Sequence, residues 1–187
     1  MPQLKIEKGS SGHSAYDLRS HLSDVVETHT LAILVENEPG VLARVIGLFS
    51  GRGYNIESLT VAEVDHKGRR SRITIVTSGT PQVINQIKMQ LGRMVPVHDV
   101  ADLTVEGPFV SRELSLIKVV AKGEHRVEAL RIAGIFRANV VDSTLESFVF
   151  EITGTPDKID AFCELMRPLG ELRLARTGVA AIARGGL

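Results

Sequence analysis

The pattern of apolar and polar positions divides residues 30–103 into strands and helices. Residues 30–35 are apolar on both faces, which is typical of a strand covered on both sides. Apolar residues further along recur at helical spacing, which predicts two amphipathic helices that each bury one side. The expected strands cover 30–35, 55–63, 72–77 and 94–103, and the expected helices cover 39–50 and a segment that opens at Thr80-Pro81 and includes Leu91.

The same order of elements recurs in the second half of the chain. Strands are expected over 113–121, 140–144, 148–153 and 172–177, and helices over 126–137 and 155–169. Two stretches also match residue by residue. Ser78-Gly79-Thr80-Pro81 resembles Thr153-Gly154-Thr155-Pro156, and Arg44–Phe49 (RVIGLF) resembles Arg131–Phe136 (RIAGIF). Two generic amphipathic helices would not share these residues, so the sequence predicts an internal repeat.

Each repeat has the order βαββαβ, which packs as a four-stranded antiparallel sheet under two helices. The expected fold class is therefore α+β, with two tandem ferredoxin-like domains. The boundary is expected near Glu106-Gly107-Pro108, giving a first domain over 27–105 and a second over 106–187. Residues 1–26 are polar and rich in Ser, His and Gly, which favours a flexible extension with a short turn of helix near residues 24–26.

Composition narrows the function classes. Apolar residues make up 43% of the 187 residues, enough for a core, but aromatics reach only 4% and Trp is absent. RNA-binding domains of this topology stack bases on aromatics of their central strands, and the expected central strands 31–35 and 73–76 have none. The 22 basic and 22 acidic residues balance, so neither nucleic acid nor a membrane is expected as a partner.

The expected compartment is the cytoplasm. The first eight residues lack the apolar core of a secretory signal. No segment approaches the roughly 20 apolar residues that a membrane span needs. The single cysteine, Cys163, leaves no internal disulfide and fits a reducing compartment.

No catalytic or metal-binding constellation stands out. The six histidines have no metal-ligand spacing to one another or to Cys163, and Cys163 falls on the apolar face of its helix as a core residue. No serine lies in a nucleophile-elbow pattern, and no glycine run forms a dinucleotide or phosphate-loop fingerprint. Asp99, Asp102 and Glu106 are expected at exposed strand positions and in the linker. The chain is therefore not expected to be an enzyme on its own.

The most distinctive stretch joins the first strand to the first helix and reads Asn37-Glu38-Pro39-Gly40-Val41-Leu42. Free backbone N–H groups at a helix start can hold a small anion, such as the carboxylate of an amino acid. Pro39 suits the first helical turn, and Asn37 is a candidate cap. The alternative is that Gly40 merely permits a tight connection, and the residues alone do not decide between the two interpretations.

Other side chains extend this candidate site. Asn37 and Asn55 offer amide groups that can bond both ends of a zwitterion. Val41, Leu42 and Ile56 can form a small aliphatic pocket beside them. Such a site suits an amino acid with a short branched side chain.

The second repeat lacks this turn. It has Gly123-Glu124-His125-Arg126-Val127, with Val127 where Gly40 would stand. A Cβ at that position would narrow the approach to the helix. Only the first domain is therefore expected to carry the site.

The second expected strand, 55–63, suggests how two copies meet. An isolated four-stranded sheet leaves edge strands with unpaired backbone groups. Pairing this strand with its copy would bury the edge and bring Asn55 toward the Pro-Gly turn of the neighbour. Such pairing agrees with a homodimer, in which a ligand that bridges two chains can shift their arrangement.

These stretches resemble a known family. Residues 30–105 are similar to ACT domains, which are small amino-acid-sensing modules. The run from Leu34 through the Pro-Gly turn to Val61 resembles the regulatory small subunits of acetolactate synthase, and the resemblance extends to Gly178-Val179-Ala180. It covers the chain except for about the first 26 residues.

The resemblance implies a non-catalytic subunit that activates a large catalytic subunit and confers feedback inhibition by valine. It implies no cofactor in this chain, with thiamine diphosphate, FAD and Mg on the catalytic subunit. The partner's reaction joins pyruvate to another 2-oxo acid on the route to valine, leucine and isoleucine. The implied valine site at the interface of two ACT domains comprises Asn37, Glu38, Pro39, Gly40, Val41 and Leu42 of one chain with Asn55 and Ile56 of the other.

A second function remains open at this point. A free-standing ACT-domain sensor could regulate another protein, such as a transporter or a transcription factor. It would need an attached effector surface, and no helix-turn-helix pattern is evident in the sequence.

Overall fold

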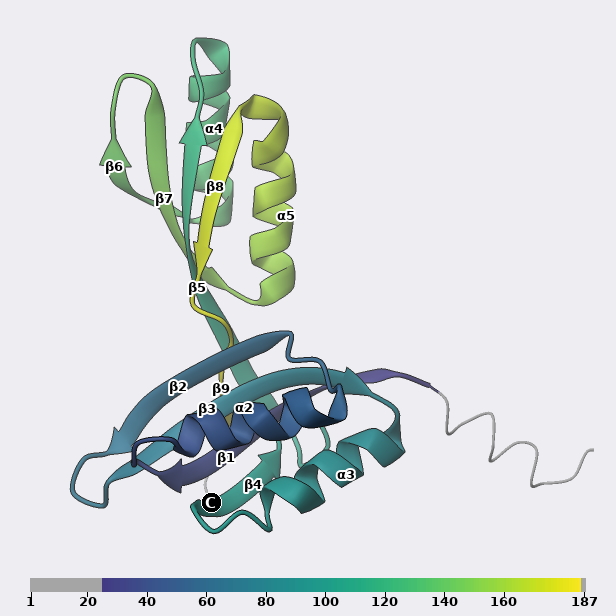
Figure 1. Cartoon of the computed structure of the whole chain (residues 1–187). Coiled ribbons are helices and arrows are strands. Elements are labelled where there is room, and N and C mark those ends of the chain that lie inside the picture. The colour runs from purple at the N-terminus through teal and green to yellow at the C-terminus, as the bar shows by residue number, and fades with distance from the viewer. Residues whose placement is uncertain (1–24, 186–187) are drawn as a thin grey trace, which may run out of the picture.

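The computed structural model describes residues 25–185. Figure 1 shows two domains, with one long strand running from the first into the second. The extension expected over residues 1–26 lies outside the described residues except at its end. Val25 and Val26 form no helical turn there, and the first strand begins directly after them, so the turn of helix expected at these two positions is wrong.

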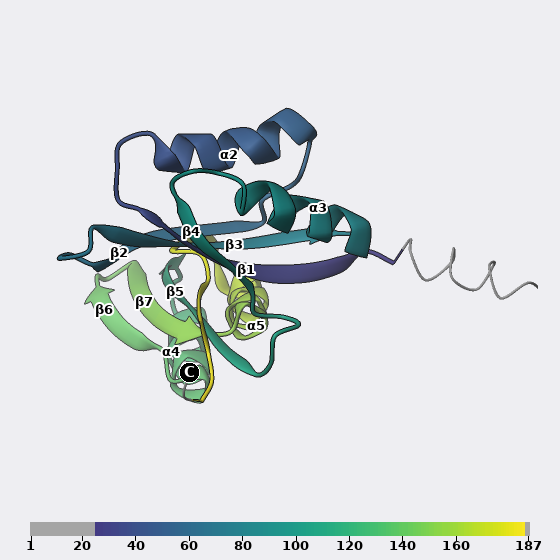
Figure 2. The ribbon, with the colours of Figure 1, turned by 90° about the horizontal axis from the view of Figure 1, so that it is seen from below.

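The first domain has the six elements that its apolar pattern predicts. They form an antiparallel sheet in the order β2-β3-β1-β4, so β1 and β3 are the central strands. Figure 2 shows α2 and α3 together on one face of this sheet, with the second domain on the opposite side. The elements are β1 (Glu27–Glu36), α2 (Val41–Arg52), β2 (Ser58–Asp65), β3 (Arg70–Gly79), α3 (Pro81–Leu91) and β4 (Val97–Asp102).

Two strands of the first domain begin three residues later than expected. The fourth strand begins at Val97 rather than at residue 94, because Pro96 has no N–H to donate to a sheet and lies in a turn. The second strand begins at Ser58, after Asn55 and Ile56. Its irregularity lies between Glu63 and Asp65, at the far end from the bulge that the apolar phase suggested.

The core of the first domain lies between the sheet and its two helices. Alternate residues of β1 point into it, and Leu31, Ile33 and Val35 are at most 2% exposed. The intervening Ala32 is also buried, on the opposite face of the sheet. The strand is therefore covered on both sides, as its continuous apolar run predicts. The helix-side cluster consists of Leu31, Ile33, Val35, Val41, Val45, Phe49, Ile73, Ile75, Ile84, Ile87 and Leu91.

The second domain repeats the topology of the first. Its sheet has the order β6-β7-β5-β8, and α4 and α5 cover one face (Figure 1). The α+β fold of two ferredoxin-like units is thus confirmed. The elements are β5 (Phe109–Val120), α4 (Glu124–Phe136), β6 (Asn139–Ser143), β7 (Ser147–Gly154), α5 (Pro156–Met166), a short 3₁₀ turn η1 (Arg167–Leu169) and β8 (Glu171–Arg176).

Phenylalanine dominates the second core. Phe162 is fully buried, and its ring meets Phe136 edge to face at 5.4 Å and Phe150 at 5.9 Å. Phe148 lies 5.5 Å from Phe150. Cys163 is also buried, as the apolar face of its helix predicts. Four of the six phenylalanines of the chain therefore hold this domain together.

The Thr-Pro repeat marks equivalent helix starts. The hydroxyl of Thr80 accepts a hydrogen bond from the backbone N–H of Val83, and the hydroxyl of Thr155 accepts one from Lys158. Each threonine is followed by a proline in the first helical turn, where a missing N–H costs nothing. The repeat in the sequence is therefore a repeated cap in the structure.

The last strand, β9 (Ala180–Ala183), was not expected from the sequence. It pairs with Phe109–Arg112, the first part of β5, and returns the chain to the first domain. Val179 and Ala181 pack there against Ala32 and Leu103, on the sheet face that carries no helix. This short ribbon attaches the second domain to the first.

Asp102 is not exposed, which corrects the expectation for the acidic residues at the end of the first domain. Its carboxylate is 0% exposed and accepts hydrogen bonds from Nδ1 of His29, at 3.0 and 3.1 Å, and from Nζ of Lys88 at 3.0 Å. Its partners come from β1 and α3, distant in sequence, so no local pattern revealed them. Asp99 and Glu106 are exposed as expected, and Glu106 accepts the backbone N–H of Asp102.

Candidate functional site

The Pro-Gly turn is an exposed connection with a backbone that calls for glycine. Gly40 has φ +86°, a left-handed conformation that residues with a Cβ rarely adopt. No atom lies within 4 Å of the position that its Cβ would take, so the space in front of the turn is open. The backbone conformation alone accounts for a glycine here, and the open space is what a ligand would need.

The helix that follows, α2, starts later than expected, and no side chain caps its N-terminal end. α2 begins at Val41, with Gly40 as its cap residue, so the expectation that Asn37 caps the helix is wrong. Asn37 is exposed, and its backbone N–H donates to the carbonyl of Arg69, just before the start of β3. That bond ties the turn to the β2–β3 hairpin.

The first N–H groups of α2 remain available to an anion. Val41 donates to the carbonyl of Glu38, and Arg44 donates to Gly40. Within the described residues, the N–H groups of Leu42 and Ala43 between them have no acceptor, and both residues are exposed. The first turn of α2 carries no acidic side chain. The positive end of the helix dipole is therefore neither capped nor neutralised.

The apolar residues of the candidate site face in different directions. Val41 is 2% exposed, and its side chain belongs to the core, so it offers a ligand only its backbone. Leu42 is 37% exposed on the outside of α2. Ile56 is half-buried against the core at the start of β2. Of the three side chains proposed for an aliphatic pocket, only Leu42 and Ile56 can contribute surface.

Asn55 and Ile56 lie at the other end of α2 from the Pro-Gly turn. The helix has 12 residues and therefore spans about 18 Å. Asn55 comes two residues after Gly53, the left-handed cap of α2, and is exposed. Its backbone carbonyl accepts a 2.6 Å hydrogen bond from the Thr77 hydroxyl. A single chain thus brings Asn37–Leu42 together but keeps Asn55 and Ile56 apart from them.

The outer edge of β2 is unpaired in the described part of the chain. β2 is the terminal strand of its sheet and pairs only with β3. Val61 is 42% and Val64 54% exposed along it. An open edge with exposed valines is suited to pairing with another strand.

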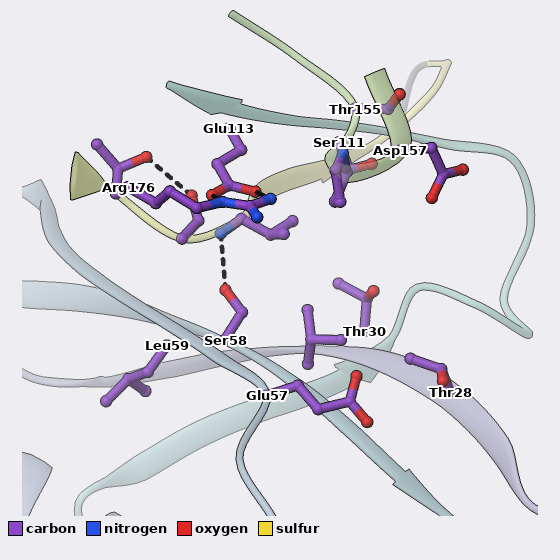
Figure 3. A pocket seen from close by; sticks show the side chains of 15 residues that line it. Thr28, Thr30, Glu57, Ser58, Leu59, Ser111, Glu113, Thr155, Asp157 and Arg176 are labelled. Carbon is purple, nitrogen blue, oxygen red and sulfur yellow. Dashed lines mark hydrogen bonds and ion pairs between the residues drawn. The ribbon is translucent and has the colours of Figure 1, made fainter. Parts of the chain in front are cut away.

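A cleft that the sequence did not predict lies between the two domains. It has a volume of about 820 Å³. Figure 3 shows Thr28, Thr30, Glu57 and Ser58 on the side of the first domain and Arg176 on the opposite wall. The cleft depends on how two domains pack, and no local pattern encodes that.

Arg176 is already bound within its own domain. Its guanidinium donates to both carboxylate oxygens of Glu113 and, at 2.6 Å, to Asp160. The hydrogen bond to Glu113 raises the pKa of Arg176 above its ordinary value, and the bond to Asp160 adds to this. The cleft is therefore lined by carboxylates and hydroxyls, and its arginine is not available to an anion.

The remaining candidates for chemistry have ordinary structural roles. Burial raises the pKa of the Cys163 thiol, which disfavours the nucleophilic thiolate. Between residues 25 and 185, no group of three or more His, Cys, Asp or Glu side chains is placed to hold a metal ion. Over the same residues, no helix is long and apolar enough to cross a membrane.

The second domain has a helix start of a different kind. α4 begins at Glu124 after Gly123, and Val127 lies in its first turn at 69% exposure. Counted from the shared motif, Val127 stands at the position of Gly40, and this part of the second repeat is helical instead of forming a Pro-Gly turn. Glu124 places a carboxylate at the positive helix end.

Comparison with known families matches both domains. Residues 31–99 match the family described as "AHAS small subunit-like ACT domain". Residues 112–185 match the family described as "Small subunit of acetolactate synthase". The two matches together span most of the described residues.

Individual relatives agree. The chain is 48% identical over 157 residues to the probable acetolactate synthase small subunit of Archaeoglobus fulgidus, covering 84% of this chain and 97% of the relative. It is 46% identical to the isozyme 3 small subunit of Salmonella typhimurium, covering 83% and 94%. The crystal structure of the Thermotoga maritima small subunit superposes with a TM-score of 0.77 at 36% identity, covering 86% of this chain and 99% of that one.

Proposed function

This chain belongs to the family of acetolactate synthase small subunits, and from that premise we propose that it is a non-catalytic regulator of the catalytic large subunit. It activates that thiamine-diphosphate-dependent enzyme and makes it sensitive to feedback inhibition by valine. The chemistry, with thiamine diphosphate, FAD and Mg, belongs to the large subunit. The controlled step leads to valine, leucine and isoleucine.

The observation that carries the effector part of this proposal is the bare start of α2. The free N–H groups of Leu42 and Ala43 lie at a positive helix end beside the open space at Gly40. An amino-acid carboxylate fits that arrangement, because it supplies acceptors and a negative charge at once. Because this turn has no acidic side chain, no carboxylate of its own competes with the ligand for the helix end.

The rest of the effector would be bound by a second copy. Its ammonium group needs an acceptor, and the side-chain oxygen of Asn55 can provide one. Because α2, about 18 Å long, separates Asn55 from the Pro-Gly turn of its own chain, the Asn55 that completes the site comes from the other copy. Leu42 and the other copy's Ile56 then border a small apolar space that suits an isopropyl group.

The open β2 edge supports one geometry for this dimer. Antiparallel pairing of β2 with its copy joins the two sheets and relates the chains by a twofold axis. Each Pro-Gly turn then approaches the start of the other chain's β2. The dimer carries two equivalent effector sites. A ligand in either site bridges the two chains and favours one arrangement of them.

The test combines the full-length chain with the catalytic subunit. Acetolactate formation is measured for the catalytic subunit alone, with this chain, and with this chain plus valine. The expected result is no activity from this chain alone, activation on mixing, and inhibition of the mixture by valine. Activation without any valine response would overturn the effector site, and no change on mixing would overturn the regulatory role.

A further inference from the structure

The connection from the second domain back to the first is hydrogen-bonded to β2. The linker Thr177–Val179 joins β8 to β9. The backbone N–H of Val179 donates to the hydroxyl of Ser58 at 2.8 Å, drawn as a dashed line in Figure 3. The hydroxyl of Thr60 donates to the carbonyl of Thr177 at 3.4 Å. The end of the second domain therefore touches the strand at which the proposed dimer forms.

Two features of the structure favour a glycine at position 178, at the centre of this linker. Its φ of +82° is in the left-handed region, where a side chain brings strain. A Cβ at this position would lie 2.9 Å from the hydroxyl oxygens of Ser58 and Thr60 and 3.1 Å from the carbonyl oxygen of Leu59. The linker lies this close to β2 only because residue 178 has no side chain.

Contacts from both domains hold the segment Asn55–Ser58, which contains the effector residues just before β2. From β3, the Thr77 hydroxyl donates to the carbonyl of Asn55, the backbone N–H of Glu57 donates to the carbonyl of Val76 at 2.8 Å, and the Ser78 hydroxyl donates to the carboxylate of Glu57. The bond from Val179 to Ser58 comes from the linker. The β3 contacts belong to the first domain, and the Val179 bond depends on the second.

We propose that the linker Thr177–Val179 positions Asn55 and Ile56 for the effector by holding Ser58, which couples valine binding to the attachment of the second domain. The 820 Å³ cleft lies beside this contact, so the walls on either side of the linker are not packed together there. Coupling of this kind is reciprocal: if the attached linker favours valine binding, bound valine favours the attached linker. The inference rests on the proposed effector site.

The first experiment compares two glycine substitutions in the full-length chain. Gly178→Ala introduces both strain and the contacts with β2. Gly185→Ala is the matched control, because Gly185 has φ +92° but no atom within 4 Å of its Cβ position. Calorimetric titration with valine is expected to show an affinity about 5- to 150-fold weaker for Gly178→Ala, the usual range of coupling between sites. Gly185→Ala is expected to bind as the unmodified chain does.

A second pair of variants separates positioning from loss of stability. Ser58→Ala removes the acceptor of the Val179 N–H, whereas Ser58→Thr keeps a hydroxyl there. With the catalytic subunit present, Ser58→Ala is expected to raise the valine concentration for half-inhibition more than it lowers activation, and Ser58→Thr is expected to restore the response. A merely destabilised chain would lose activation and inhibition in proportion.

The outcomes distinguish this inference from the function on which it rests. If the unmodified chain binds no valine, the proposed effector function fails, and the inference with it. If the unmodified chain binds valine but Gly178→Ala and Gly185→Ala bind it equally well, only the inference is overturned. If Gly178→Ala does not fold, the Ser58 pair decides, and equal valine responses of the two Ser58 variants would overturn the linker's role.

Discussion

The starts of α2 and α4 differ although the two helices share the motif Arg44–Phe49 and Arg131–Phe136. Arg44 lies three residues after the first residue of α2, whereas Arg131 lies seven residues after the first residue of α4. Relative to the shared motif, α4 begins one turn earlier. That turn takes the place of the Pro-Gly connection in the first domain.

The shift changes what each helix end can bind. In the second domain, Glu124 supplies a carboxylate within the first turn of α4. In the first domain, Gly40 precedes a helix with no acidic residue in its first turn. Both ends have the same dipole, but one is already neutralised by its own chain. The fold therefore does not require the Pro-Gly turn, which favours a function for it over a purely structural role.

The two domains also differ in what holds their cores. The second has a cluster of phenylalanine rings around Phe162. The first has mainly aliphatic side chains with Phe49 and, on the helix side of the sheet, the buried carboxylate of Asp102 with His29 and Lys88. Removing one apolar side chain from a core leaves a cavity. Removing one partner of a buried ion pair leaves an unpaired charge in the interior.

The largest stability effect is expected for Phe162→Ala in the second domain. The ring is fully buried between Phe136 and Phe150, and removing such a side chain costs about 3–5 kcal/mol. Urea unfolding followed by circular dichroism measures the change. Leu165→Ala on the 49% exposed side of the same helix is the control, expected to cost much less. Equal costs would show that the phenylalanine cluster does not carry the second domain.

The matching prediction for the first domain is Asp102→Asn. The amide keeps the shape but removes the charge that faces Lys88 and His29, and breaking a buried ion pair from one side costs about 3 kcal/mol or more. Asp99→Asn, exposed on the same strand, is expected to stay within about 0.5 kcal/mol. The measurement is again urea unfolding. A change at Asp102 as small as that at Asp99 would remove the buried network from the account of this domain.

Local patterns were sufficient to predict most of the fold. Element order and class follow from the spacing of apolar residues, and the Thr80-Pro81 and Thr155-Pro156 caps come from short motifs. The strand β9 could not be predicted because its partner, Phe109–Arg112, lies about 70 residues away and precedes the expected start of the strand at residue 113. Asp102 was misjudged for the same reason: its burial depends on His29 and Lys88, which only the folded sheet brings near.

The candidate site divides in a similar way. The open turn at Gly40 could be predicted, because a Pro-Gly pair before a helical stripe dictates its local geometry. Two features of the site could not be predicted: the core-facing side chain of Val41 and the later start of the helix. Both depend on which residue takes the cap position. The hydrogen bond between Val179 and Ser58 joins positions 121 residues apart, and no local sequence pattern indicates it.

The difference between the two helix starts can be removed by Gly40→Asp. The new carboxylate would neutralise the end of α2, as Glu124 does for α4, and would repel the ligand's own carboxylate. Asp also tolerates the left-handed backbone better than most residues. Valine affinity is expected to fall by more than about 100-fold, or about 2.8 kcal/mol, in calorimetry and in inhibition assays with the catalytic subunit.

Two controls separate charge from size and place. Gly40→Asn fills the same space without a charge and is expected to weaken valine binding less than Gly40→Asp. Val127→Asp adds the same carboxylate to the exposed first turn of α4 and is expected to leave the valine response unchanged. If Gly40→Asp remained fully valine-sensitive, the turn would not be the effector site.

The smallest predicted effect concerns the opposite ends of the same two helices. Asn55 and Asn139 occupy equivalent places, because Tyr54 and Ala138 just before them donate to carbonyls five residues back, Phe49 and Ala133. The carbonyl of Asn55 is held by Thr77, while its side chain is free to meet a ligand.

Asn55→Ala is expected to weaken valine binding by about 1–3 kcal/mol, the cost of leaving a buried group of the bound ligand without its partner. Asn139→Ala should not change it, because the second repeat has no seat for the ligand's carboxylate. Mixing Asn55→Ala chains with Gly40→Asp chains gives a sharper result. In a heterodimer, one of the two sites combines both substitutions and the other has neither, so mixed chains should regain one site with normal affinity by calorimetry. A mixture that stays as weak as its two components would mean that Gly40 of one chain and Asn55 of the other do not form a shared site.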